Sequence, residues 1–397
     1  MEQQTTKTTE KIRFADILTK PEQGHAMLLG IFCFLSCLIL PLANTPSLPS
    51  LYLVSVIVFF YLLTRSIRAM LYYALPAMLL FLASGIFPTL PTALLPTYFV
   101  ALVLGGATGG FVLIHYHDLK KYPYVLAIPM GAYALAALIT GNPLVALLSL
   151  LPFALSAVAA LCVLLLVKRT DATLILAGTL AVTLAAAGAL ACAVSGVEGS
   201  PLTFLADTVR GGIHSLLAQM EGVYAEAGMT LGMSEIAVSN AATLLVNLLP
   251  GLYLAACSIT AFLALRLLLQ FLIAFRSVPH LPVRLGGFTV SRVSAVVFIA
   301  TYLLSLFTNY STATLFGTVC SNLALALEPG LALVGVSALL PRGNARSCLS
   351  TLLLTVMLVL AVTDPLLGLE LAALTGAVCV LTARLMRSPD QDNKGVK

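Results

Sequence analysis

The positive charges of this chain lie in a regular pattern that a membrane protein explains. Twenty of the 21 Lys and Arg residues fall in gaps that would all face one side of a membrane if the apolar runs are threaded as twelve helices. Positive residues near the ends of membrane spans are retained in the cytoplasm, so we predict that both termini are cytoplasmic. The cationic gaps are residues 1–24, 65–68, 120–121, 168–169, 266–292, 342–346 and 384–397, and Arg210 alone lies outside them.

The composition excludes an ordinary soluble domain. Charged residues make up 9% of the chain and hydrophobic residues 60%, against about 25% and 45–50% in soluble domains. Apolar runs of about 20 residues can cross a bilayer as helices, and the runs are too continuous for a barrel. We therefore predict an all-α polytopic helix bundle in the cell (plasma) membrane. The net charge of +5 fits orientation and contact with lipid headgroups, and we predict no nucleic-acid partner.

The apolar runs predict about twelve transmembrane helices in two groups. A cytoplasmic tail, 1–24, precedes an N-terminal bundle of seven helices over 25–196. An outer loop, 197–235, separates it from a C-terminal bundle of five helices over 236–386, and a second tail, 387–397, follows. The expected spans are 25–43, 51–64, 69–87, 93–115, 123–141, 143–167, 172–196, 241–265, 292–309, 312–340, 348–363 and 366–386.

The outer loop, 197–235, contains the pattern of an amphipathic helix. Its apolar residues recur with spacings of three and four, which places them on one helix face. One interpretation is a helix that lies on the outer leaflet or on the bundle, and the other is a lid over an outward-facing cavity. The apolar positions are Val209, Ile213, Leu216, Met220 and Val223, and the opposite face holds Asp207, Arg210, His214 and Glu221.

Glu328 is the most informative charged residue, because an ionised side chain in the middle of a membrane helix is costly. It lies in the run 312–340 and is followed by Pro329 and Gly330. Proline disfavours helix at the preceding residue, so we predict a helix break beside the carboxylate, with freed backbone groups that form a solute or ion site. The alternative is a simple kink in which Glu328 is protonated or paired with an arginine. Asn322 is predicted to point into the same space.

Arg266 and Asn247 belong to the run that begins near Ala241. If that helix ends at Leu265, Arg266 reaches the inner interface with its long side chain. If the helix instead begins at Pro250, Arg266 is embedded and can pair with Glu328. Asn247, just before Pro250, marks a kink near the outer end.

Asp364 and Glu370 form a weaker candidate for cation binding at the start of the last helix. An aspartate cap followed by Pro365 explains Asp364 without any function. Glu370 lies about a turn and a half further along and is expected to face the interior.

No recognised catalytic or cofactor motif is present in the chain. There is no Walker sequence, no Ser-His-Asp set and no metalloprotease motif, and the eight cysteines show no zinc-binding spacing. We therefore predict a protein that is not an enzyme and that binds neither a cofactor nor a metal. Gly105, Gly106, Gly109 and Gly110 have the spacing that allows close helix approach.

The last third of the chain resembles the YybS-like family of uncharacterised bacterial membrane proteins. The resemblance covers roughly residues 240–386 and rests on the span from Pro250 to Arg266, on Asn322 followed by Gly330, and on the helix introduced by Asp364. That family is distantly similar to the substrate-binding components of energy-coupling-factor transporters. The resemblance implies an apolar helix unit with a pocket for a small molecule.

Two hypotheses of function follow. The first is a transport-related protein that binds a small solute between its helices, with candidate residues Glu328, Asn322, Asn247, Arg266, Asp364 and Glu370. The second is a non-enzymatic structural or assembly protein of the cell envelope, whose outer loop docks membrane partner proteins. An enzyme acting on lipid-linked substrates has no support from any paired acid and base.

Overall fold

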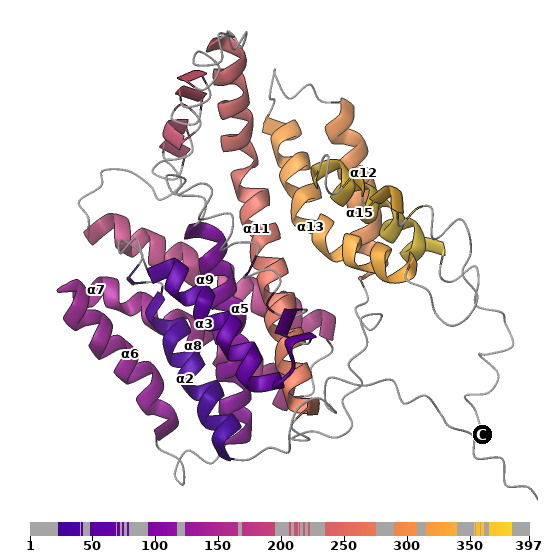
Figure 1. The fold of residues 1–397 in the computed structure, drawn as a ribbon. Coiled ribbons are helices and arrows are strands. Elements are labelled where there is room, and N and C mark those ends of the chain that lie inside the picture. The colour runs from indigo at the N-terminus through magenta and orange to yellow at the C-terminus, as the bar shows by residue number, and fades with distance from the viewer. Residues whose placement is uncertain are drawn as a thin grey trace, which may run out of the picture. The chain divides into compact units, whose positions relative to one another are not determined.

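In the computed structural model of the chain, nearly all of the described residues are helical (Figure 1). No strand occurs among these residues. The described residues are 23–39, 41–42, 48–68, 94–116, 124–165, 169–194, 235–274, 290–307, 315–339 and 365–382, with scattered positions within 70–78, 206–222 and 353–360.

Most of the expected apolar runs are helices with nearly the expected bounds. The helices are α2 (Gln23–Ile39), α3 (Leu48–Thr64), α5 (Leu94–His115), α6 (Tyr124–Thr140), α7 (Pro143–Ala146), the 3-10 turn η2 (Leu147–Leu150), α8 (Leu151–Leu164), α9 (Arg169–Val194), α11 (Glu235–Ala274), α12 (Arg292–Phe307), α13 (Leu315–Leu339) and α15 (Pro365–Thr382). The expected spans 69–87 and 348–363 lie mostly outside the described residues.

Five of the described helices are long and apolar enough to cross a membrane. They cover Thr97–His115, Pro143–Leu164, Asp171–Leu190, Thr243–Ala274 and Leu315–Leu339. Five shorter apolar helices accompany them within the described part of the chain. The all-helical class of the fold is thus confirmed, while the total of about twelve spans stays a prediction.

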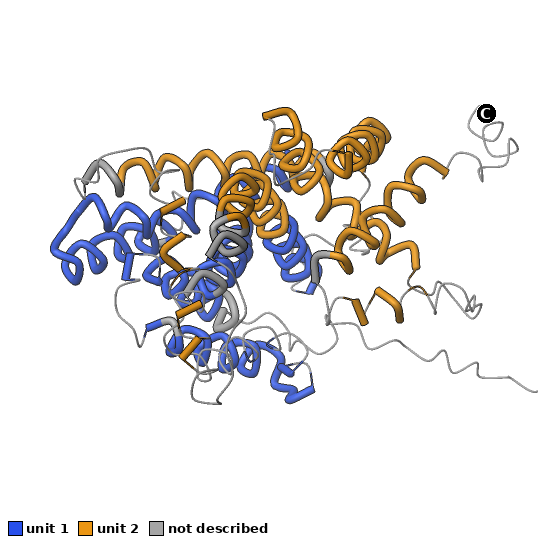
Figure 2. The backbone as a smooth tube through the Cα atoms, turned by 90° about the horizontal axis from the view of Figure 1, so that it is seen from above, with its two compact units in different colours: residues 1–167, 262–283 blue, residues 168–261, 284–397 orange. Residues whose placement is uncertain are grey.

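The chain divides into two compact units, coloured separately in Figure 2. Unit 1 comprises residues 1–167 and 262–283, and unit 2 comprises residues 168–261 and 284–397. The boundary between the units therefore falls inside α11. Helix α9, which we grouped with the N-terminal bundle from the sequence, belongs to unit 2 in this division.

Glycines of α5 bring the helices of unit 1 close together. A Cβ atom added at Gly105 would lie 2.8 Å from the Cβ of Pro152 in α8, and one at Gly110 would lie 2.9 Å from Leu268 in α11. Such distances are shorter than real Cβ contacts, so a larger residue would require Pro152 or the end of the Leu268 side chain to shift. The Ser156 hydroxyl of α8 adds a hydrogen bond of 2.9 Å to the Gly105 carbonyl. The predicted close packing at these glycines is confirmed.

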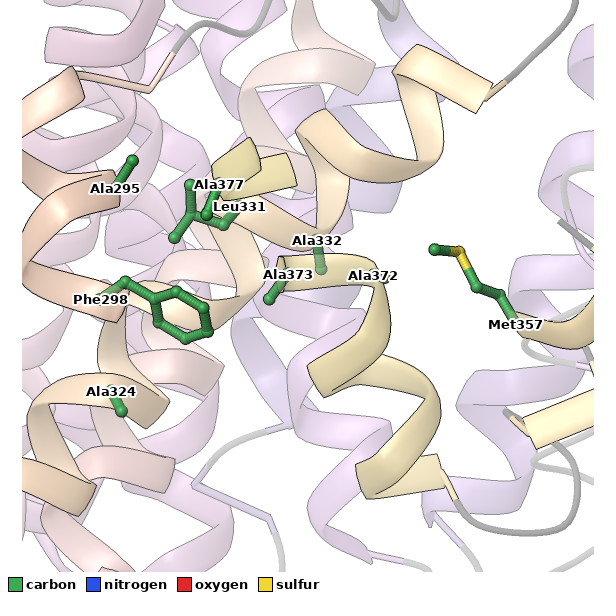
Figure 3. Close-up of a cluster of buried hydrophobic side chains, with 9 residues drawn as sticks. All are labelled: Ala295, Phe298, Ala324, Leu331, Ala332, Met357, Ala372, Ala373 and Ala377. Carbon is green, nitrogen blue, oxygen red and sulfur yellow. The ribbon is translucent and has the colours of Figure 1, made fainter. Parts of the chain in front are cut away.

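The core of unit 2 is built by α12, α13 and α15, with Met357 from the segment between the last two (Figure 3). Small residues dominate it, so the helix backbones approach closely. A Cβ at Gly335 of α13 or at Gly376 of α15 would overlap backbone atoms of the other helix. The buried cluster consists of Ala295, Phe298, Ala324, Leu331, Ala332, Met357, Ala372, Ala373 and Ala377.

Prolines do not end the helices in which they lie. Pro250 lies inside α11 and Pro329 inside α13, and both helices continue on either side. The predicted break beside Glu328 is therefore wrong. A proline removes one backbone hydrogen bond and crowds one carbonyl, a local cost that apolar packing along a long membrane helix offsets.

The residues predicted for the polar face of the outer loop are described by the structure. Asp207, Arg210, His214 and Glu221 are helical and exposed, and Arg210 lies 3.3 Å from the Asp207 carboxylate. The apolar positions predicted for the opposite face lie outside the described residues. Both interpretations of this segment, a helix on the bundle or the outer leaflet and a lid, stay predictions.

Candidate functional site

Glu328 is buried in the apolar core of unit 2. Its side chain is 4% exposed, and its Oε1 atom has no hydrogen-bond partner among the described residues. Helical spacing places it on the same face of α13 as Ala324, Leu331 and Gly335, which are buried as well. No ion pair with an arginine or a lysine satisfies it within the described part of the chain. A carboxyl group without such partners is unusual in a packed core.

A second carboxyl group, that of Glu370, lies on α15, which packs closely against α13, the helix that carries Glu328. Glu370 is half-buried, and its Oε2 accepts a hydrogen bond of 3.0 Å from the hydroxyl of Tyr302 on α12. Three helices thus contribute Glu328, Glu370 and Tyr302, which we call the acid pair and its tyrosine. The predicted inward position of Glu370 agrees with this arrangement.

Tyr302 could not be chosen as a site residue from the sequence. It follows Ala295 and Phe298 at spacings of seven and four, so all three occupy one face of α12. Its ring stacks on that of Phe298, with 5.8 Å between the ring centroids. This spacing can be read from the sequence. It does not single out Tyr302, because the hydrogen bond to Glu370 forms only where α15 packs beside α12.

Asn322 joins α13 to α11 and does not share the surroundings of Glu328. Its Nδ2 donates to the Asn247 carbonyl at 2.7 Å, and its Oδ1 accepts from the Gly251 amide at 2.5 Å. In a regular helix these two backbone groups would bond to each other. The Asn322 side chain therefore bridges α11 beside Pro250, and we call this arrangement the asparagine bridge.

The asparagine bridge uses most of the hydrogen-bonding capacity of Asn322. Its second amide hydrogen is donated to the Thr318 carbonyl at 2.8 Å. Asn247 takes part through its backbone carbonyl, not through its side chain. Both residues were candidates for solute binding, and the hydrogen bonds give them a role in holding two helices together.

Two candidates remain, Arg266 and Asp364. Arg266 lies within α11, which continues to Ala274, so a helix that ends at Leu265 or begins at Pro250 is wrong. Residue 266 belongs to unit 1, whereas Glu328 belongs to unit 2. Asp364 lies outside the described residues.

The described residues contain no group of three His, Cys, Asp or Glu side chains that could hold a metal ion. Six cysteines within the described part of the chain are free thiols, and five of these are buried. They act as small apolar residues in the helix interfaces. Among the described residues of unit 2, Glu328, Glu370 and Tyr302 are the groups that we consider further as a candidate site.

One family model matches the chain. It is described as “Predicted membrane protein (DUF2232)”, and it covers residues 112–367, more than half of the 397 residues. The match includes Tyr302, Asn322 and Glu328 and ends shortly before Glu370. No curated protein and no solved structure matches the chain.

Proposed function

Because the chain belongs to the DUF2232 family of predicted membrane proteins, we propose that it binds a small solute among the helices of unit 2 and takes part in its transport. The observation that carries this proposal is the buried Glu328, whose Oε1 has no partner within the described residues. A charged group at the centre of a membrane helix costs about 2.5–3.5 kcal/mol on insertion scales. Such a residue is by default a candidate for binding a solute or an ion.

The finer features of the proposal come from the sequence. We propose about twelve spans in a bacterial plasma membrane, with both termini cytoplasmic, and a relationship of residues 240–386 to the YybS-like family. Its distant similarity to energy-coupling-factor substrate-binding components supports a small molecule as the ligand and other membrane proteins as partners. We also propose that the chain is not an enzyme and needs no cofactor.

The orientation is tested by cysteine labelling in intact cells. All native cysteines are first replaced by serine or alanine. With Glu221→Cys, an impermeant maleimide should label the protein from outside, because residue 221 is exposed and lies in the predicted outer loop. With Arg284→Cys, labelling should require permeabilised cells. Labelling at 284 with protection at 221 would reverse the topology.

Solute binding is tested by mass spectrometry of the purified protein with Glu328→Gln. We expect the wild-type chain to retain a small molecule that Glu328→Gln loses by at least about tenfold, a loss equivalent to about 1.4 kcal/mol of binding. Glu221→Gln, at an exposed position, is the matched control and should retain it. Equal retention by all three proteins would give Glu328 a packing role only. Uptake of the identified molecule into proteoliposomes then tests transport.

A structural or assembly role in the envelope is the second candidate. It is favoured by the exposed face formed by Asp207, Arg210, His214 and Glu221, which the predicted topology places outside the cell. A protein that retains no solute and catalyses no uptake, but whose removal disrupts the envelope, would favour this role.

A further inference from the structure

The buried carboxyl group of Glu328 has an oxygen, Oε1, that accepts no hydrogen bond from any described residue. We propose that the solute bound there carries a cationic nitrogen, such as an ammonium or an amidinium, whose N–H groups donate to the Glu328 carboxylate. This inference rests on the proposed function, because it names the chemical class of the solute at the same site.

Helix α13, which carries Glu328, has no donor to offer to this side chain. Inside an α-helix each backbone N–H donates to the carbonyl four residues earlier, so the amides of α13 are already engaged. Pro329, the next residue, has no N–H at all. Ala324 and Leu331, which share the buried face of α13 with Glu328, have apolar side chains. The missing donor therefore has to come from outside α13.

The helices packed against α13 in the core of unit 2 do not supply the donor either. The hydroxyl of Tyr302 on α12 has one hydrogen, and it donates that hydrogen to Glu370 at 3.0 Å. The other buried core residues of α12 and α15 are apolar, and they are Ala295, Phe298, Ala372, Ala373 and Ala377. Glu328 thus lies among groups that cannot donate a hydrogen bond to it.

These three helices also lack a positive charge for Glu328. Their only basic residue is Arg292, which is exposed at the first position of α12 and forms no ion pair with Glu328. A charge buried in a protein is normally paired, because leaving water without a partner is costly. A positively charged solute would bring both the counter-charge and the donor that the described core lacks.

Pro329 provides a second acceptor close to the carboxylate. Because proline has no N–H, the carbonyl of Leu325, four residues earlier, has no donor at its usual place in the helix. This carbonyl and Glu328 lie about one turn apart on α13. An ammonium has three N–H donors, so one nitrogen can serve more than one acceptor.

The same groups disfavour other classes of ligand. Repulsion from the carboxylate opposes an anionic solute. A hard metal cation takes about six or more oxygen ligands, and the described residues contain no cluster of three His, Cys, Asp or Glu side chains. A nitrogen cation needs far fewer ligands, because each of its N–H groups requires only one acceptor.

The experiment compares methylammonium with tetramethylammonium by saturation-transfer difference NMR on the full chain in nanodiscs of uncharged lipid, after extensive washing. Both probes are cations, but only methylammonium has N–H donors. Ligands with so few atoms bind weakly, so each probe is used at about 100 mM. We expect a methylammonium signal above that of empty nanodiscs and a tetramethylammonium signal equal to it. A methylammonium signal at the background, or equal signals from both probes, would overturn the proposal.

Variants then assign the methylammonium signal to Glu328. Glu328→Gln removes the negative charge at nearly constant shape and should reduce the signal to the background. Glu328→Asp keeps a carboxylate and should retain part of the signal, and Glu221→Gln, at an exposed position, should retain all of it. A full signal in Glu328→Gln would overturn the assignment. The comparison of the two probes on the wild-type protein requires no variant, so it stands even if a variant fails to fold.

The molecule that purifies with the wild-type protein separates this inference from the proposed function. A molecule with a basic nitrogen that Glu328→Gln loses would support both. A neutral or anionic molecule that Glu328→Gln loses would leave the proposed function in place and overturn the cationic nitrogen. If no molecule is retained but methylammonium binds at Glu328, the cation site stands and solute retention is the part that fails.

Discussion

Gly376→Ala should lower the free energy of unfolding of the protein by about 1–3 kcal/mol, the usual cost of overpacking a tight core. A Cβ at residue 376 would overlap the Leu331 carbonyl and would also come too close to the backbone nitrogen of Gly335. Because both clashes involve backbone atoms, α13 and α15 would have to move apart. Reversible unfolding in mixed detergent micelles measures the change.

Gly178→Ala is the matched control for this prediction. Gly178 lies inside α9, and a Cβ there would meet no atom within 4 Å. Alanine is a better helix former than glycine, so this change should raise the free energy of unfolding by about 0.5–1 kcal/mol. The same substitution is thus expected to have opposite signs at the two positions. A stabilising Gly376→Ala would mean that the two helices are not in close contact.

Asn322→Ala should lower the free energy of unfolding by about 2 kcal/mol. The change removes the three hydrogen bonds of the Asn322 side chain, to Asn247, Gly251 and Thr318. Each side-chain hydrogen bond within a membrane protein contributes on the order of 0.6 kcal/mol, and up to about 1.7 kcal/mol. The same unfolding measurement applies.

Asn247→Ala tests the asparagine bridge from the other side. Since Asn247 contributes its backbone carbonyl, its side chain can be removed with a change of no more than about 0.5 kcal/mol. Equal losses for Asn247→Ala and Asn322→Ala would contradict the bridge. A loss of bound solute in Asn322→Ala without any loss of stability would return Asn322 to the solute site.

The sequence was sufficient to predict the helices because a membrane span depends on local properties. Apolar length determines whether a segment can cross, and α5, the segment from α7 to α8, and α13 appear close to the expected bounds. Local signals around proline were misleading. Pro250 allowed a helix start as one of two alternatives and Pro329 predicted a helix break, yet α11 and α13 continue through them. Long helices packed along their length can lose one backbone hydrogen bond and remain helical.

The candidate site was predictable only one residue at a time. Glu328 was recognisable because a charge in an apolar run has a cost wherever its neighbours lie. The hydrogen bond between Tyr302 and Glu370 was not, since the two residues are separated by 68 positions along the chain and meet through helix packing. Asn322 was expected beside Glu328, but the bridge to α11 places it on a different face of α13.

The sequence by itself determined that this chain is an apolar, helical membrane protein with a costly carboxyl group at residue 328. These properties follow from hydropathy and charge, which each segment carries independently of the others. Only the tertiary structure decided which helices meet. The positions of the acid pair, the asparagine bridge and the contact of Gly335 with Gly376 all follow from those helix contacts. Those contacts depend on how helix surfaces fit together, and small residues far apart in the chain set that fit.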